Sequence, residues 1–145
     1  MRASHKPSPA ARNRARRLAM QALYQWQLSA TEPTELVRQF ESDDEFRGVD
    51  RDYFEALVRG VTDAVEELDA LFEADLDRPL KEIDPVEKAV LRLAAYELRS
   101  RLDVPYRVVL NEAVALTKKF GAEQAHTYVN GVLDKLARRL RSAEQ

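Results

Sequence analysis

The residue types best suited to chemistry lie close together near the start of the chain, where arginines are followed by a glutamine and a tyrosine. These candidates are Arg12, Arg14, Arg16, Arg17, Gln21 and Tyr24. At about 100° per residue, Arg14, Gln21 and Tyr24 lie along one side of a helix, whereas Arg12 and Arg16 lie along another. Guanidinium groups bind phosphates and stack on bases, and a neighbouring aromatic ring offers a platform for a base. The pattern favours binding of single-stranded RNA, although a solvated helix face would have the same composition.

Catalytic chemistry finds little support in the remaining residues. The chain has two histidines, His5 and His126, and no cysteine, and neither histidine stands in a metal-ligand spacing. The acidic run Asp43-Asp44-Glu45 lacks the ligand spacing and turn glycine of a calcium loop, so a solvated face is expected there. No glycine-rich phosphate loop or nucleophile elbow occurs. We therefore expect a protein that is not an enzyme, with no catalytic residues, metal site or cofactor.

Charge is distributed unevenly along a chain whose formal net charge is only -2. Residues 1–30 carry six basic and no acidic groups, residues 31–87 carry six basic and 19 acidic groups, and residues 88–145 carry eleven basic and six acidic groups. A basic arm on an acidic body is typical of a protein that meets a polyanion at one end and a basic protein at the other.

The spacing of apolar residues predicts an all-α fold, because they recur at intervals of three and four and only four glycines interrupt the chain. Residues 1–9 are expected to form a flexible leader. Six helices are predicted. The first spans about 10–29, the second begins at residue 33, and the third is one long helix that Asp50 caps and that reaches Phe72. The fourth begins at residue 85 after the cap Asp84, the fifth spans 105–120, and the sixth spans about 122–141. They divide into two three-helix subdomains, 10–80 and 81–145, packed as one compact domain.

The expected cellular location follows from the absence of membrane-spanning and secretion signals in the sequence. Its apolar stretches are far shorter than the ~20 residues that span a bilayer, and its beginning has no apolar signal region. Absence of cysteine allows a reducing compartment. We expect no membrane association and a cytoplasmic protein.

Two residues within the helical pattern have more than one interpretation. Glu97 interrupts an apolar stripe, and it is either a buried carboxylate paired with Arg92, Arg101 or a backbone group, or part of a partner surface. Gly131 costs a helix about 1 kcal/mol relative to alanine, so a close helix crossing or the approach of a ligand is expected there.

Several segments, in order and spacing, carry a family resemblance. They are Ala15–Trp26, Tyr53-Phe54 with Leu57–Val61, Glu87–Leu98, Asp103-Val104-Pro105, Asn111–Val114, Lys118–Gly121 and Tyr128–Asp134. Through these segments the chain resembles the NusB family of bacterial transcription antitermination proteins over nearly its full length. Two positions depart from the family pattern: Asn13, where a further arginine is common, and Tyr128, where phenylalanine is common.

The resemblance implies an all-helical fold of two three-helix subdomains and a non-enzymatic role. Proteins of this family bind the single-stranded boxA element of ribosomal RNA transcripts as a heterodimer with NusE, a small-subunit ribosomal protein, within the RNA polymerase antitermination complex. The RNA-binding residues that the resemblance implies are Arg12, Arg14, Arg16, Arg17, Gln21, Tyr24 and Tyr128. The partner-binding residues that it implies are Glu82, Glu87, Arg92 and Tyr96.

Two other functions remain open at this stage. The first is a helical module that binds only proteins and also forms homodimers. The second is the RNA-binding module of an RNA methyltransferase, which would need a separate catalytic domain of Rossmann type.

Overall fold

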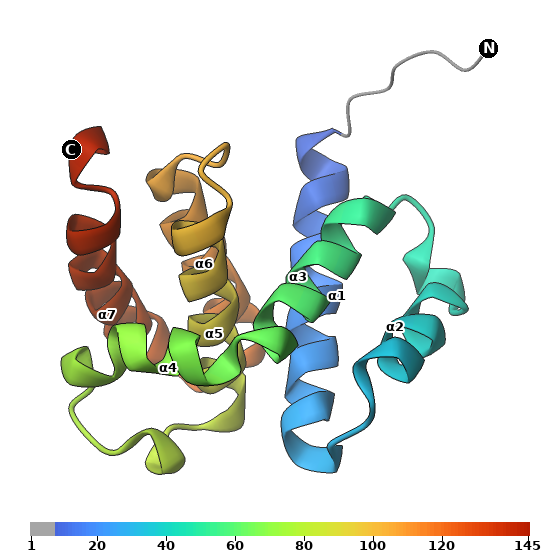
Figure 1. Ribbon diagram of the computed structural model, residues 1–145, viewed down its shortest axis with the longest axis horizontal. Helices are drawn as coiled ribbons and strands as arrows, with labels where there is room; N and C mark the ends of the chain where they lie inside the picture. The colour runs from blue at the N-terminus through green and yellow to red at the C-terminus, as the bar shows by residue number, and fades with distance from the viewer. Residues whose placement is uncertain (1–7) are drawn as a thin grey trace.

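Helix α1 (Pro9–Ser29) has helices on both of its sides (Figure 1). The computed structural model describes residues 8–145 and has no β-strand within them. The helices that follow are α2 (Pro33–Glu41), α3 (Arg51–Asp63), α4 (Val65–Phe72), α5 (Pro85–Ser100), α6 (Tyr106–Phe120) and α7 (Ala125–Leu140). Short 3₁₀ turns lie between or after them: η1 (Asp44–Phe46), η2 (Glu73–Asp75), η3 (Leu80–Glu82) and η4 (Ser142–Glu144). The all-α prediction is confirmed.

Helix starts follow the capping residues of the sequence. Asp50 accepts a hydrogen bond from the backbone N–H of Tyr53 at 3.1 Å, and Asp84 accepts one from Val86 at 2.9 Å. Ser8 caps α1 in the same way, with Pro9 in its first turn. Helix α1 therefore begins inside the predicted leader, and the rest of that leader, residues 1–7, lies outside the described residues.

The single long helix predicted between Asp50 and Phe72 is wrong. Helix α3 ends at Asp63 and α4 begins at Val65, with Ala64 between them at a φ of -129°. Figure 1 shows α4 turning away from the line of α3. The turn buries Phe72 completely and lets α4 contact α5 and α7. The apolar spacing continues across Ala64, which is why periodicity alone predicts no break.

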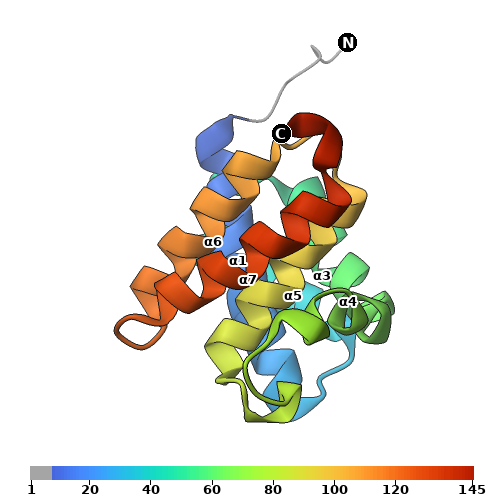
Figure 2. The same cartoon turned by 90° about the vertical axis from the view of Figure 1, so that its left-hand side faces the viewer.

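Two groups of helices share one core. Helix α1 packs against α2, α3 and α5, while α5 also packs against α6 and α7, which lie side by side in Figure 2. Leucines such as Leu23, Leu57, Leu91 and Leu133 are fully buried along these contacts. The subdomain boundary at residue 80 stays a prediction, because α4 contacts helices on both sides of it.

Gly60 is the glycine at a close helix crossing. A Cβ built on it would lie 2.2 Å from the ring of Tyr96, so α3 and α5 meet there at a distance that only glycine permits. Gly131 has no such neighbour, since nothing lies within 4 Å of its Cβ position. The crossing predicted at Gly131 is therefore wrong.

No helix among residues 8–145 combines the length and the apolar character that crossing a bilayer would need.

Candidate functional site

A hollow of about 780 Å³ opens where α1, the η1 turn and the end of α6 meet. These elements contribute four cationic side chains, Arg14, Arg17, Arg47 and Lys119, and two carboxylates, Asp44 and Glu45, so cations predominate. Within residues 8–145, none of the four forms an ion pair with a carboxylate. This surface, which we call the cationic hollow, therefore has charge available for an anion such as a phosphate.

Gly48 shapes one wall of the cationic hollow. Its φ is +79°, a left-handed conformation that glycine adopts without strain. The Arg14 guanidinium donates a hydrogen bond to the Gly48 carbonyl at 3.3 Å, and a Cβ at this position would lie 2.8 Å from the same guanidinium. Glycine thus lets the turn close against Arg14 and hold it in place.

A second hollow of about 620 Å³ continues along α1 and is mainly apolar. Tyr24 and Leu28 line it from α1, Phe40 from α2 and Phe120 from the end of α6. Tyr24 is 37% exposed. Phe120 also lines the cationic hollow, so charged and aromatic surfaces adjoin. Aromatic rings beside cations are the usual platform for unpaired bases.

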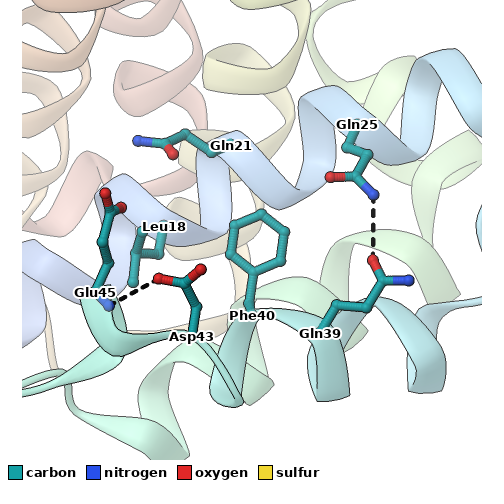
Figure 3. A pocket seen from close by; sticks show the side chains of 7 residues that line it. All are labelled: Leu18, Gln21, Gln25, Gln39, Phe40, Asp43 and Glu45. Atoms are coloured by element: carbon teal, nitrogen blue, oxygen red, sulfur yellow. Dashed lines mark hydrogen bonds between the residues drawn. The ribbon is translucent and has the colours of Figure 1, made fainter.

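A third hollow of about 340 Å³ lies between α1 and the α2–η1 segment, and we call it the glutamine pocket. Figure 3 shows Phe40 in its centre, with Gln25 and Gln39 to one side and Asp43 and Glu45 to the other. Gln21 lines all three hollows. The three form one continuous surface along α1, which agrees with the predicted placement of Arg14, Gln21 and Tyr24 on one side of this helix.

Arg16 does not line this surface, and its predicted role in RNA binding stays a prediction. The residue is only 3% exposed, and its Nε donates to both oxygens of Glu97, at 2.9 and 3.1 Å. The hydroxyl of Tyr53 donates to Glu97 as well. Burial and the facing Glu97 carboxylate raise the pKa of Tyr53 above its usual value. Arg16 turns inward because the buried carboxylate on α5 needs a positive partner.

Arg12 also faces the α3–α5 side of α1. Its guanidinium stacks over the ring of Tyr53, 4.3 Å from the ring centre, and forms ion pairs with Asp103 at 3.3 Å and Asp50 at 3.8 Å. Hydrogen bonds from Arg101 and Arg12 lower the pKa of Asp103 to about 2. Arg12 is engaged within the protein and does not line the hollows, so its role in RNA binding stays a prediction.

Tyr128 lies away from the three hollows, on α7 beside the turn that follows η2. Its hydroxyl accepts a hydrogen bond from the backbone N–H of Asp77 at 3.1 Å, and the Arg78 guanidinium stacks on its ring at 5.3 Å. The same Arg78 interacts with the charge of Glu87 on α5. Burial, together with the charge of Asp84, raises the pKa of Glu87. The structure thus does not bring Tyr128 together with Arg14 and Gln21, and its predicted contact with RNA stays untested.

The predicted partner residues differ in what they touch. Arg92 donates to both oxygens of Asp69 at 2.8 Å and to Gln27 at 3.0 Å, which ties α5 to α4 and α1. Tyr96 packs against Gly60. Glu87 is nearly buried, whereas Glu82 in η3 is exposed. Arg92 and Tyr96 therefore hold helices together, and Glu82 is the member of this set most open to a partner.

Four residues of the hollows were not predicted to bind RNA: Arg47, Lys119, Phe40 and Phe120. The signal for Lys119 and Phe120 was a basic pair followed by an aromatic residue at a helix end. Arg47 lies within the most acidic part of the chain, so the distribution of charge along the sequence does not indicate that it belongs to a basic surface. Helical periodicity does not indicate that the end of α6 meets the start of α1.

Comparisons with known proteins agree with the all-helical fold. A family model described as the NusB family matches residues 13–138. The transcription antitermination protein NusB of Idiomarina loihiensis is 54% identical over 94% of this chain and 99% of its own length. The NusB protein of a Marinomonas species is 52% identical over 99% of this chain and 84% of its own length. A crystal structure of the antitermination factors NusB and NusE in complex with double-stranded RNA superposes with a TM-score of 0.81 at 30% identity, covering 91% of this chain and 99% of the other.

Proposed function

This chain belongs to the NusB family, and from that membership we propose that it is an RNA-binding transcription antitermination factor. It binds boxA RNA of ribosomal RNA transcripts as a heterodimer with the ribosomal protein NusE. The heterodimer acts in the cytoplasm as part of the RNA polymerase antitermination complex, by binding rather than by catalysis.

One observation carries the proposal: three separate elements bring Arg14, Arg17, Arg47 and Lys119 together beside Phe120, and none of these cations is neutralised by an ion pair with a described residue. An RNA strand would place phosphates in the cationic hollow and bases along the aromatic rings of the adjoining hollow. The related structure of NusB and NusE with RNA supports both partners for this chain.

The acidic side chains between α4 and α5 suit the second partner. Glu73 is exposed, as is Glu82, one of the predicted partner residues. A ribosomal protein is basic because it binds ribosomal RNA, so opposite charges would speed the encounter. Arg92 and Tyr96 contribute by keeping α5 in position for that contact.

The proposal is tested by fluorescence anisotropy with a labelled boxA RNA and a scrambled RNA, with and without NusE, over a range of salt concentrations. We expect tighter binding to boxA, strengthened by NusE. Neutralising Arg17 and Lys119 (Arg17→Gln, Lys119→Gln) should lower the salt slope by about 0.7 for each lost phosphate contact.

The matched control is Arg38→Gln, which removes an exposed arginine of α2 that lies outside the cationic hollow. Its salt slope should equal that of the wild type. Equal affinity for both RNAs, with no effect of NusE, would contradict the proposed function.

A further inference from the structure

The glutamine pocket needs an explanation of its own, because Asp43 and Glu45 are its charged lining residues and no arginine or lysine lines it. We propose that this pocket binds one unpaired guanine base of the RNA strand whose phosphates lie in the cationic hollow. The inference rests on the proposed function and deepens it, since it assigns the residues that read the sequence of the RNA.

The pocket offers room and a stacking surface for a base. Its volume of about 340 Å³ lies within the range of small-molecule sites, ~300–1,000 Å³. Phe40 lines the pocket and packs against Phe54 in the core, with the ring centres 5.9 Å apart. A ring that is held from behind presents a fixed platform, and stacking on such a ring is a common way to bind unpaired bases.

The polar groups around Phe40 are two carboxylates, which only accept hydrogen bonds, and three glutamine amides, which both donate and accept. The Asp43 carboxylate accepts from the backbone N–H of Glu45 at 2.8 Å through one oxygen, which fixes its position and leaves the other oxygen available. The Glu45 carboxylate forms no ion pair or side-chain hydrogen bond within residues 8–145. Gln25 donates to Gln39 at 3.3 Å, so the two amides hold each other in place at one side of the pocket (Figure 3).

Guanine matches these groups at both kinds of side chain. Its Watson–Crick edge carries two adjacent N–H donors, at N1 and N2, that can face a carboxylate with one hydrogen bond to each oxygen. Its O6 can accept from a glutamine amide such as that of Gln21. Uracil presents a single N–H donor between two carbonyl oxygens. A carboxylate that faces this edge would be repelled by the carbonyl oxygens.

Continuity with the cationic hollow places such a base on a bound strand. Gln21 and Glu45 line both the glutamine pocket and the cationic hollow. A strand held by Arg14 and Arg17 therefore passes the mouth of the pocket. The pocket has carboxylates without cations, so the phosphate stays beside the arginines of the cationic hollow and the base enters the pocket.

The test uses two short uridine-rich RNAs that differ at one position, guanosine in one and inosine in the other. Inosine keeps N1–H and O6 but lacks the N2 amino group. A lost hydrogen bond to a charged group corresponds to about a tenfold change in affinity. We expect the wild type to bind the guanosine RNA about tenfold more tightly, measured by anisotropy.

Two variants separate base reading from simple charge effects. In the double variant Asp43→Asn and Glu45→Gln, where asparagine retains the capping ability of residue 43, we expect the ratio of the two affinities to fall to about one. The matched control is Asp44→Asn, because Asp44 lines the cationic hollow but not the glutamine pocket. This control should keep the tenfold ratio.

The outcomes distinguish this inference from the function on which it rests. If both RNAs bind in a salt-dependent manner but with equal affinity, or if the double variant raises both affinities and leaves their ratio unchanged, the guanine pocket is wrong while RNA binding stands. If neither RNA binds at any salt concentration, the proposed function fails and the pocket fails with it.

Discussion

The ion pair between Arg16 and Glu97 lies inside the protein, with both side chains almost fully buried. Removal of one member would leave the other charge without its partner in a medium of low polarity, which typically costs about 3–5 kcal/mol. We expect Arg16→Met to lower the free energy of unfolding by this amount, as measured by urea denaturation followed by circular dichroism.

A double variant provides the control for this prediction. Arg16→Met combined with Glu97→Leu removes both charges, so it should recover much of the lost stability. A loss of less than about 1 kcal/mol in Arg16→Met alone would show that water reaches the pair. Because Arg16 is structural, tests of RNA binding should leave it intact.

Glu41 gives the protein a specific response to pH. One of its oxygens is buried without a hydrogen-bond partner, while Arg51 pairs with the other at 2.7 Å. Burial and the neighbouring Glu55 carboxyl raise the pKa of Glu41 from 4.5 to about 6, although Arg51 acts in the opposite direction. The folded state therefore binds this proton more tightly than the unfolded state does. The stability contributed by the protonated form is fully present below pH 4.5 and is lost as the pH rises through about 6.

We expect Glu41→Gln to be more stable than the wild type above pH 6, by on the order of 1 kcal/mol, and to lose this advantage as the pH falls toward 4.5. Urea denaturation at a series of pH values measures the difference. An advantage that does not vary with pH would mean that Glu41 does not titrate in this range.

Residue identity alone predicted part of the site. Helical geometry correctly separated Arg14, Gln21 and Tyr24 from Arg12 and Arg16, because the angle per residue depends only on the backbone. The burial of Arg16 could not be predicted, since an arginine near a chain start is usually solvated. Glu97 is indeed a paired buried carboxylate, but its partners are Arg16 and Tyr53 rather than Arg92 or Arg101.

At the scale of elements, the crossing of α3 and α5 depends on the absence of a side chain at Gly60. A methyl group there would overlap the Tyr96 ring, which would have to shift from its place between the helices. Such overpacking typically costs about 1–3 kcal/mol, more than the gain in helix propensity of about 1 kcal/mol. We therefore expect Gly60→Ala to lower the melting temperature.

Gly131→Ala is the matched control, because the same substitution in α7 meets nothing within 4 Å. This variant should be more stable than the wild type by about 0.5–1 kcal/mol, since alanine favours the helix. If both variants were stabilised, the contact between Gly60 and Tyr96 would not be tight in solution.

Helix starts could be predicted well because a cap and a proline act within one turn of the chain. The break at Ala64 and the meeting of α1, η1 and α6 could not, because both depend on contacts between residues far apart in sequence. The cationic hollow was therefore predicted only in the part that α1 contributes. Arg47 and Lys119 needed the three-dimensional arrangement.

At the scale of the whole molecule, two surfaces differ in the sign of the charge that predominates on them. The cationic hollow lies along α1, whereas the segment from α4 to the start of α5 is rich in exposed carboxylates such as Glu73 and Glu82. We expect Glu73→Gln combined with Glu82→Gln to slow association with NusE several-fold at low salt, and to leave the affinity for RNA alone unchanged. Stopped-flow association kinetics measure the first effect and anisotropy the second.

The control for this prediction removes two exposed carboxylates from other elements, Asp52→Asn in α3 and Glu123→Gln before α7. The overall charge is then the same in both variants. Equal slowing by the two would indicate that net charge, rather than the segment between α4 and α5, governs the encounter.

The buried pair of Arg16 and Glu97 also restricts how this protein can change over evolutionary time. A mutation of either residue alone leaves an uncompensated charge in the interior. A protein that carries only one of the two substitutions is therefore expected to fold poorly in most cases. Replacement of Glu97 by glutamine is the mildest first step, because glutamine still accepts a hydrogen bond from the guanidinium. The two positions are thus expected to be inherited together, and a lineage that loses the arginine should have lost the glutamate as well.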